Sequence, residues 1–191
     1  MRVDYAVELD DAAAYEVPWR NAATGNAYLD LRATPRSVEQ IEPARTRQPL
    51  RGFLTAVNSA DSVFATLACR ADNDSADPGV FHSEVALMFA VPEAEFNYTR
   101  QVYEDLSGEL LALLMRDAGA DTVGVLLSVR RCRYLQENRA GFCLVVHLEA
   151  QGESSGQAEL RWGLALARIQ QALLYASRVI RHHLPRAEGA V

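Results

Sequence analysis

The feature that most constrains the fold of this chain is a recurring order of two strand-like runs followed by one helical segment. Apolar stripes at a spacing of three or four residues predict one helix from Pro92 to about Gly119 and another over about 157–183. A weaker helical segment over 37–57 is interrupted by Pro43, Pro49 and Gly52, so we expect a broken helix there. The strand-like runs cover residues 3–10, 28–32, 63–71, 80–91, 122–135 and 141–150.

This order repeats three times at a period of about 60 residues, although the three units share almost no residue identity. It predicts an α+β protein with a mostly antiparallel six-stranded sheet. Helices would pack on one face to give a two-layer sandwich. The 191 residues are expected to form a single domain of three ββα units, at about 1–60, 61–120 and 121–191.

The chain contains no lysine, because all nineteen of its basic residues are arginine. A Schiff-base lysine, a P-loop lysine, a kinase strand lysine and a Ser–Lys pair are therefore all impossible. This excludes pyridoxal-phosphate enzymes, Walker-type nucleotide hydrolases and Schiff-base aldolases. No cofactor is predicted.

The net charge is −6, which argues against binding to nucleic acid or to an anionic membrane, since both need a basic surface. The cysteines Cys69, Cys132 and Cys143 are far apart and include no CxxC pair, so we expect reduced thiols. The N-terminal residues lack the apolar core of a signal peptide, and no apolar run is long enough for a membrane span. We expect a cytoplasmic protein.

Two strand-like runs carry the same His-x-Glu spacing, His82 with Glu84 and His147 with Glu149. In the first hairpin, the apolar pattern places Val63, Leu67 and Cys69 on the core face. The opposite face then holds Phe64, Thr66, Ala68 and Arg70 beside His82, Glu84, Ala86 and Met88. A loop over 73–79 would set Arg70 opposite His82 and diagonal to Glu84.

The last hairpin shows the same arrangement. Val125, Leu127 and Val129 are expected on the core face. Leu126, Ser128, Arg130 and Cys132 then share the opposite face with Cys143, Val145, His147 and Glu149. Arg130 would lie opposite or diagonal to His147 and Glu149. The pattern therefore predicts the same trio, Arg with His-x-Glu, on one face of both hairpins.

Three interpretations of this face remain open. It is a solvated face with cross-strand ion pairs, or an interface between subunits, or a ligand site. Apolar residues such as Phe64, Met88, Leu126 and Val145 favour the interface, since they are unusual on an uncovered face. In a ligand site the arginines would hold an anion while a histidine oriented by glutamate transferred protons. The arginines argue against a metal.

We therefore predict a non-enzymatic binding or assembly protein that acts as a homo-oligomer, with a dimer favoured, through its non-helical sheet face. The alternative is a small lysine-free enzyme acting on an anionic metabolite. The partner would be an unknown protein or a small anionic ligand. The candidate acid–base residues are His82, Glu84, His147 and Glu149, and the candidate binding residues are Arg70, Arg130, Ser128 and Met88.

Overall fold

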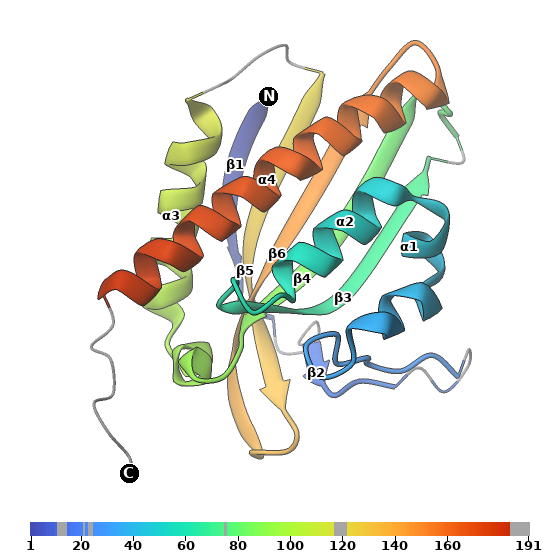
Figure 1. The fold of residues 1–191 in the computed structure, drawn as a ribbon. Coiled ribbons are helices and arrows are strands. Elements are labelled where there is room, and N and C mark those ends of the chain that lie inside the picture. Colours follow the sequence, from blue (N-terminus) through green and yellow to red (C-terminus); the bar gives the residue numbers. More distant parts are fainter. Residues whose placement is uncertain (11–14, 21, 23–24, 75, 117–121, 184–191) are drawn as a thin grey trace.

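A computed structural model describes residues 1–10, 15–20, 22, 25–74, 76–116 and 122–183. The protein has mixed α and β content, with a six-stranded sheet and several helices (Figure 1). The strands are β1 Arg2–Glu8, β2 Tyr15–Val17, β3 Phe64–Asn73, β4 Val80–Phe89, β5 Val123–Tyr134 and β6 Arg139–Gln151. The α-helices are α1 Glu42–Thr46, α2 Gln48–Val57, α3 Arg100–Met115 and α4 Ser155–His183, and two 3-10 helices, η2 Pro35–Gln40 and η3 Glu93–Tyr98, complete the elements.

The sheet is mixed, because it contains parallel as well as antiparallel pairings. Its strand order is β1-β5-β6-β4-β3, and the three pairings among β3, β4, β6 and β5 are antiparallel. Both β1 and β2 instead run parallel to β5, along successive parts of the same edge of that strand. The first two strands therefore pair with β5 and not as a hairpin, so the first expected ββα unit differs from the other two.

The second predicted strand, over 28–32, is wrong. The Asp30 side chain accepts hydrogen bonds from the backbone N–H groups of Arg32 and Ala33 at 2.9 and 3.0 Å. An aspartate whose side chain accepts from the backbone N–H groups two and three residues later stabilises a turn in place of a strand. The strand partner from this part of the chain is β2, at Tyr15–Val17.

Prolines and the Asn97 side chain explain where the helices begin. The helix expected over 37–57 is broken into η2, α1 and α2, and Pro43 and Pro49 lie in the first turns of α1 and α2. The helix expected from Pro92 begins only at Arg100. Asn97 explains the delay, because its side chain accepts from Phe89 N and donates to Phe89 O, both at 2.8 Å, and holds η3 against the end of β4.

The main hydrophobic core lies between the sheet and the helices. The longest helix, α4, crosses the sheet in Figure 1 and contributes a buried stripe at helical spacing, Ala158, Trp162, Ala165, Leu166, Ile169, Ala172, Leu173 and Ala176. The Trp162 indole packs on Phe81, with 4.6 Å between ring centroids, and donates a hydrogen bond of 2.7 Å to Ser83 Oγ. Side chains from α2 and α3 belong to the same core.

A bulge in β3 changes which of its residues face the core. The pairing of β3 with β4 shifts between Thr66 and Ala68. Phe64 therefore joins the main core, whereas Leu67 packs on the other side of the sheet, the reverse of the predicted faces. An extra residue in one strand moves the residues on one side of it to the opposite face, so the predicted alternation holds only from Ala68 onward.

Candidate functional site

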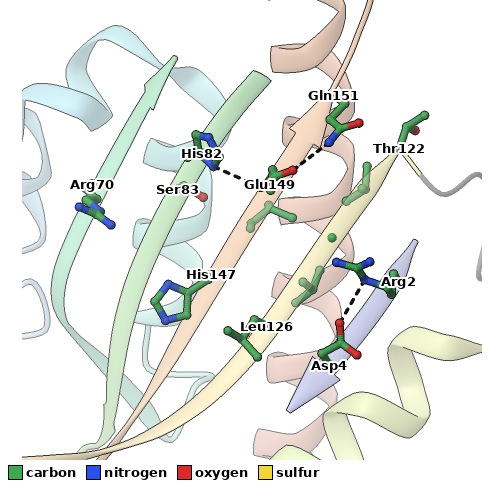
Figure 2. Close-up of a pocket in the computed structure, with 14 residues that line it drawn as sticks. Arg2, Asp4, Arg70, His82, Ser83, Thr122, Leu126, His147, Glu149 and Gln151 are labelled. Atoms are coloured by element: carbon green, nitrogen blue, oxygen red, sulfur yellow. Dashed lines mark hydrogen bonds and ion pairs between the residues drawn. The ribbon is translucent and has the colours of Figure 1, made fainter. Parts of the chain in front are cut away.

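The two His-x-Glu motifs lie side by side on neighbouring strands. Because β4 and β6 are antiparallel, His82 pairs with Glu149 and Glu84 pairs with His147. Each histidine thus faces the glutamate of the other motif. We call this side of the sheet the polar face, defined by Arg70, His82, Glu84, His147 and Glu149. Figure 2 shows four of these side chains, Arg70, His82, His147 and Glu149, on the same side of the sheet.

Glu84 is the most connected acid of the polar face. Its carboxylate accepts a hydrogen bond from the Tyr15 hydroxyl and lies 3.2 Å from Arg70 Nη2 and 3.4 Å from His147 Nδ1. Tyr15 comes from β2, so its role depends on the parallel pairing of β2 with β5. Nothing in the local sequence indicated it. Burial and the Glu84 carboxylate together raise the pKa of the Tyr15 hydroxyl, which therefore stays protonated and donates.

Arg70 lies directly opposite Glu84, and Asp72 lies opposite His82, so the predicted register of this hairpin was wrong by two residues. Strand pairing continues to Asn73 opposite Phe81, and the Asp74 N–H bonds to Val80 O at 2.9 Å. The loop is therefore shorter than the sequence suggested. Because of this shift, Arg70 pairs with Glu84 and not with His82.

His82 bridges two carboxylates near the end of the sheet. Its Nε2 lies 3.5 Å from Asp74 Oδ2, and its Nδ1 lies 3.7 Å from Glu149 Oε2. The backbone N–H of Ala76 is the main cause that lowers the Asp74 pKa, and His82 contributes to the same shift. His82 and Glu149 are about half exposed, so this group is open to solvent.

His147 differs from His82 because its ring is partly buried. Burial lowers its pKa, the nearby Glu84 carboxylate opposes that shift, and the Arg130 guanidinium adds to it. Its Nε2 is buried and has no hydrogen-bond partner among the described residues. With Nδ1 toward Glu84, the neutral ring leaves Nε2 as a buried acceptor without a partner among the described residues, which is uncommon in proteins.

Arg130 does not form the second predicted trio. In the pairing of β5 with β6, Leu126 lies opposite His147, and Arg130 lies opposite Cys143. The Arg130 guanidinium instead lies 2.6 Å from Glu8 Oε2, and Ser128 Oγ donates to Glu8 Oε1 at 2.8 Å. Arg130 and Ser128 therefore anchor β1 to β5. The two hairpins therefore do not carry the same trio, because β1 pairs with the free edge of β5 and its Glu8 binds Arg130.

Part of this side of the sheet is covered by the chain itself. A second apolar cluster contains Val145, Cys132 and Cys143 of the sheet together with Val17, and Tyr15, Tyr28 and Met88 pack against it. The Trp19 indole donates a 2.7 Å hydrogen bond to Leu67 O. We call the described residues of 15–28 the covering segment. Met88 and Val145 suggested a subunit interface, but this segment covers them.

The remaining part of the polar face is a depression of about 670 Å³. Its walls include His82, His147 and Glu149, and the Arg2–Asp4 ion pair of 3.1 Å lies at the β1 side (Figure 2). Gly124 of β5 lines it as well, and nothing lies within 4 Å of the position that a Cβ there would occupy. A glycine inside an apolar strand is the sequence signal that could have located this hollow.

The charged side chains that line the depression are two arginines, Arg2 and Arg70, and two carboxylates, Asp4 and Glu149. Arg2 and Arg70 are each paired with a carboxylate, whereas Glu149 and Asp74 have only His82 in ion-pair contact. Within the described part of the chain, no group of three His, Cys, Asp or Glu side chains could hold a metal ion. No described helix has the length and apolar character needed to cross a membrane.

The fold and this face define the chain as an α+β protein with a depression on its sheet that is lined by histidine and charged side chains. No family model, no curated protein and no solved structure matches it.

Proposed function

We propose that this chain is a non-enzymatic binding protein whose ligand occupies the depression on the polar face. In this proposal α2, α3 and α4 form one layer, and the other face of the sheet is left for binding. The observation that carries the proposal is that the chain covers the apolar part of that face and leaves open the part where His82, Glu149 and one side of His147 line the depression. Open hollows lined by a few convergent polar groups are the usual ligand sites of proteins.

The charge of the depression indicates the chemistry of the ligand. Both arginines of the lining are neutralised, because Arg2 and Arg70 are paired with Asp4 and Glu84. Glu149 is about half exposed and has no arginine partner in the described ion pairs. A ligand with a positive group fits this surface better than the anionic metabolite that the sequence suggested.

Spermidine and citrate are suitable probes, because they carry opposite charges and are small enough for the hollow. We expect spermidine at low ionic strength to shift the NMR signals of the His82 and His147 rings, and citrate to leave them unchanged. Glu149→Gln should weaken spermidine binding about fivefold, the effect of ~1 kcal/mol. Glu95→Gln is the matched control, since Glu95 is exposed and pairs with Arg139 outside the depression. Binding of citrate alone, or of neither probe, would overturn the proposal.

A specific observation favours the enzymatic alternative, namely the buried and unpartnered Nε2 of His147. In this second candidate function His147 transfers protons, Glu84 orients its ring through Nδ1, and Arg70 holds an anionic group of the substrate. The lowered pKa keeps the imidazole neutral near pH 7, as a general base requires.

Hydrolysis of p-nitrophenyl acetate tests whether either histidine is reactive. If His147 is a base, His147→Gln should abolish the rate above background, and His82→Gln should retain it. A wild-type rate equal to that of His147→Gln would reject the enzymatic alternative and leave the binding proposal in place.

A further inference from the structure

The largest concentration of exposed apolar side chains lies on α4. Leu160 and Leu164 are 64% and 62% exposed, and Tyr175 and Val179 are 49% and 38% exposed. Among the described residues, half of the large apolar side chains that are exposed lie on this one helix. Exposed apolar residues scattered singly need no explanation, but a contiguous set indicates a binding surface.

Leu160, Leu164 and Tyr175 lie on one face of the helix, and the small Ala167 and the polar Gln171 occupy the positions between Leu164 and Tyr175. Leu160, Leu164, Ala167, Gln171 and Tyr175 follow one another at intervals of four, three, four and four residues. Such intervals place them on a single face, which lies opposite the buried face of Trp162, Ile169 and Leu173. This stripe of five residues therefore points away from the sheet. Figure 1 shows α4 running across the molecule with its outer side uncovered by other elements.

A hollow beside the stripe could receive an apolar side chain. It measures about 190 Å³ and lies between α3 and α4, where its walls include Leu113, Leu114, Gln171 and Tyr175. Met115 at the end of α3 is also exposed. A leucine presented by a partner helix would fit this kind of hollow, as ridges of one helix pack into grooves of another.

The charges of α4 are distributed unevenly along its length. Glu159 is the only acidic residue of the helix and lies 3.9 Å from Arg47 of the same chain, whereas Glu153 is exposed just before the first turn. From Leu160 to His183 there is no acid, and Arg161, Arg168, Arg178 and Arg181 follow. Two copies in parallel would bring the basic ends together. Two antiparallel copies would bring the exposed Arg178 of each copy toward the exposed Glu153 of the other, and their helix dipoles would also oppose.

We propose that two copies of this chain associate through antiparallel α4 helices related by a two-fold axis near Ala167 and Arg168. In this register Leu160 of each copy meets Tyr175 of the other, and Leu164 meets Gln171 beside the hollow. The same patch thus serves both subunits, as a two-fold dimer requires. This surface is distinct from the polar face, so the depression remains open in the dimer.

Sedimentation equilibrium of the full chain tests the dimer. We expect a mass near twice the 21.1 kDa of one chain at about 100 μM, and a monomer for Leu164→Arg at the same concentration. Leu164 is exposed, so this variant should fold, and unchanged circular dichroism would verify that. Leu135→Arg is the matched control, because Leu135 is exposed outside α4. A monomeric wild type would mean that a different partner covers the stripe and would overturn the proposal.

Disulfide trapping tests the antiparallel register. Ala167→Cys lies near the two-fold axis and should link to its own copy under mild oxidation. Leu160→Cys should link only when mixed with Tyr175→Cys. Wild type is the blank, because Cys132 and Cys143 are buried and Cys69 is mostly buried. Self-linking of Leu160→Cys at the rate of Ala167→Cys would indicate parallel helices and would contradict the proposed geometry.

Discussion

At the scale of single residues, Glu84 connects four strands of the sheet, since it lies on β4 and also pairs with Arg70 of β3. It accepts from Tyr15 of β2 and faces His147 of β6. Its side chain is only 17% exposed, so these partners replace most of its water. A carboxylate in such a position stabilises the fold as long as it remains charged and paired.

Replacing Glu84 by glutamine should lower the free energy of unfolding by about 1–3 kcal/mol, because the ion pair with Arg70 is lost and Tyr15 then donates to a neutral acceptor. The pKa of His147 should fall further, since the Glu84 carboxylate opposes its downward shift. Urea unfolding and NMR titration measure the two effects. Glu149→Gln is the control, and as a half-exposed residue it should cost less than about 1 kcal/mol. Equal costs at the two positions would contradict this account.

The lowered pKa of His147 should make stability depend on pH. Burial keeps the folded-state pKa below the ordinary value of about 6.5, so the unfolded chain binds this proton more readily than the folded one. The stabilisation is therefore complete above pH ~6.5 and is lost as the pH falls below it. Urea unfolding at several pH values should show this decline, and His147→Gln should make it shallower. An unchanged slope in the variant would mean that other groups cause it.

At the scale of elements, two glycines in adjacent strands have opposite surroundings. Nothing lies within 4 Å of a Cβ built at Gly124 of β5. A Cβ at Gly141 of β6 would lie 2.5 Å from Asn97 O and 2.9 Å from Tyr134 Cε2. Gly141 therefore permits the close approach of η3 to β6, whereas Gly124 only leaves the depression open.

Gly124→Val should leave stability unchanged or raise it by up to about 1 kcal/mol, because a β-branched residue favours a strand. It should also fill part of the depression and weaken spermidine binding. Gly141→Ala is the matched comparison and should destabilise by about 1–3 kcal/mol, since the backbone of Asn97 must shift. Thermal unfolding of both variants measures the contrast. A similar loss of stability in both variants would show that the space around each glycine does not decide the effect of its replacement.

At the scale of the whole molecule, the covering segment packs over the second apolar cluster, on the same side of the sheet as the polar face. Val17 is buried in the second apolar cluster, and β2 holds it there by pairing with Cys132–Tyr134 of β5. The sheet is thus covered on one side by helices α2 and α4 and on part of the other by residues from the N-terminal region (Figure 1).

Val17→Asp should detach this cover, because an unpaired buried carboxylate is strongly unfavourable. We expect increased binding of a hydrophobic fluorescent dye and a loss of about 2–4 kcal/mol in unfolding free energy. Glu16→Asp, at the exposed neighbouring position, is the control. The dimer mass should persist in Val17→Asp, since α4 lies on the other side of the sheet. No increase in dye binding would contradict the role assigned to the covering segment.

Much of the local structure could be predicted from the sequence. The last four strands, the broken segment before residue 57 and the stripe of α4 follow from apolar spacing and proline positions, which act over a few residues. The start of α3 and the turn at Asp30 could not, because side-chain hydrogen bonds of Asn97 and Asp30 compete with the local pattern. The bulge at Thr66–Ala68 also leaves no periodic signal and reverses the faces of Phe64 and Leu67.

The sequence by itself determined which chemistries the chain lacks, the two His-x-Glu motifs and the side of the last hairpin on which His147 lies. Only the tertiary structure decided that the two motifs face each other, that Tyr15 binds Glu84, and that Arg130 binds Glu8. The physical reason is that alternation along a strand specifies its faces but not its neighbours. The neighbours of β4, β5 and β6 depend on pairings between residues far apart in the chain, and those pairings placed the charged groups of this site.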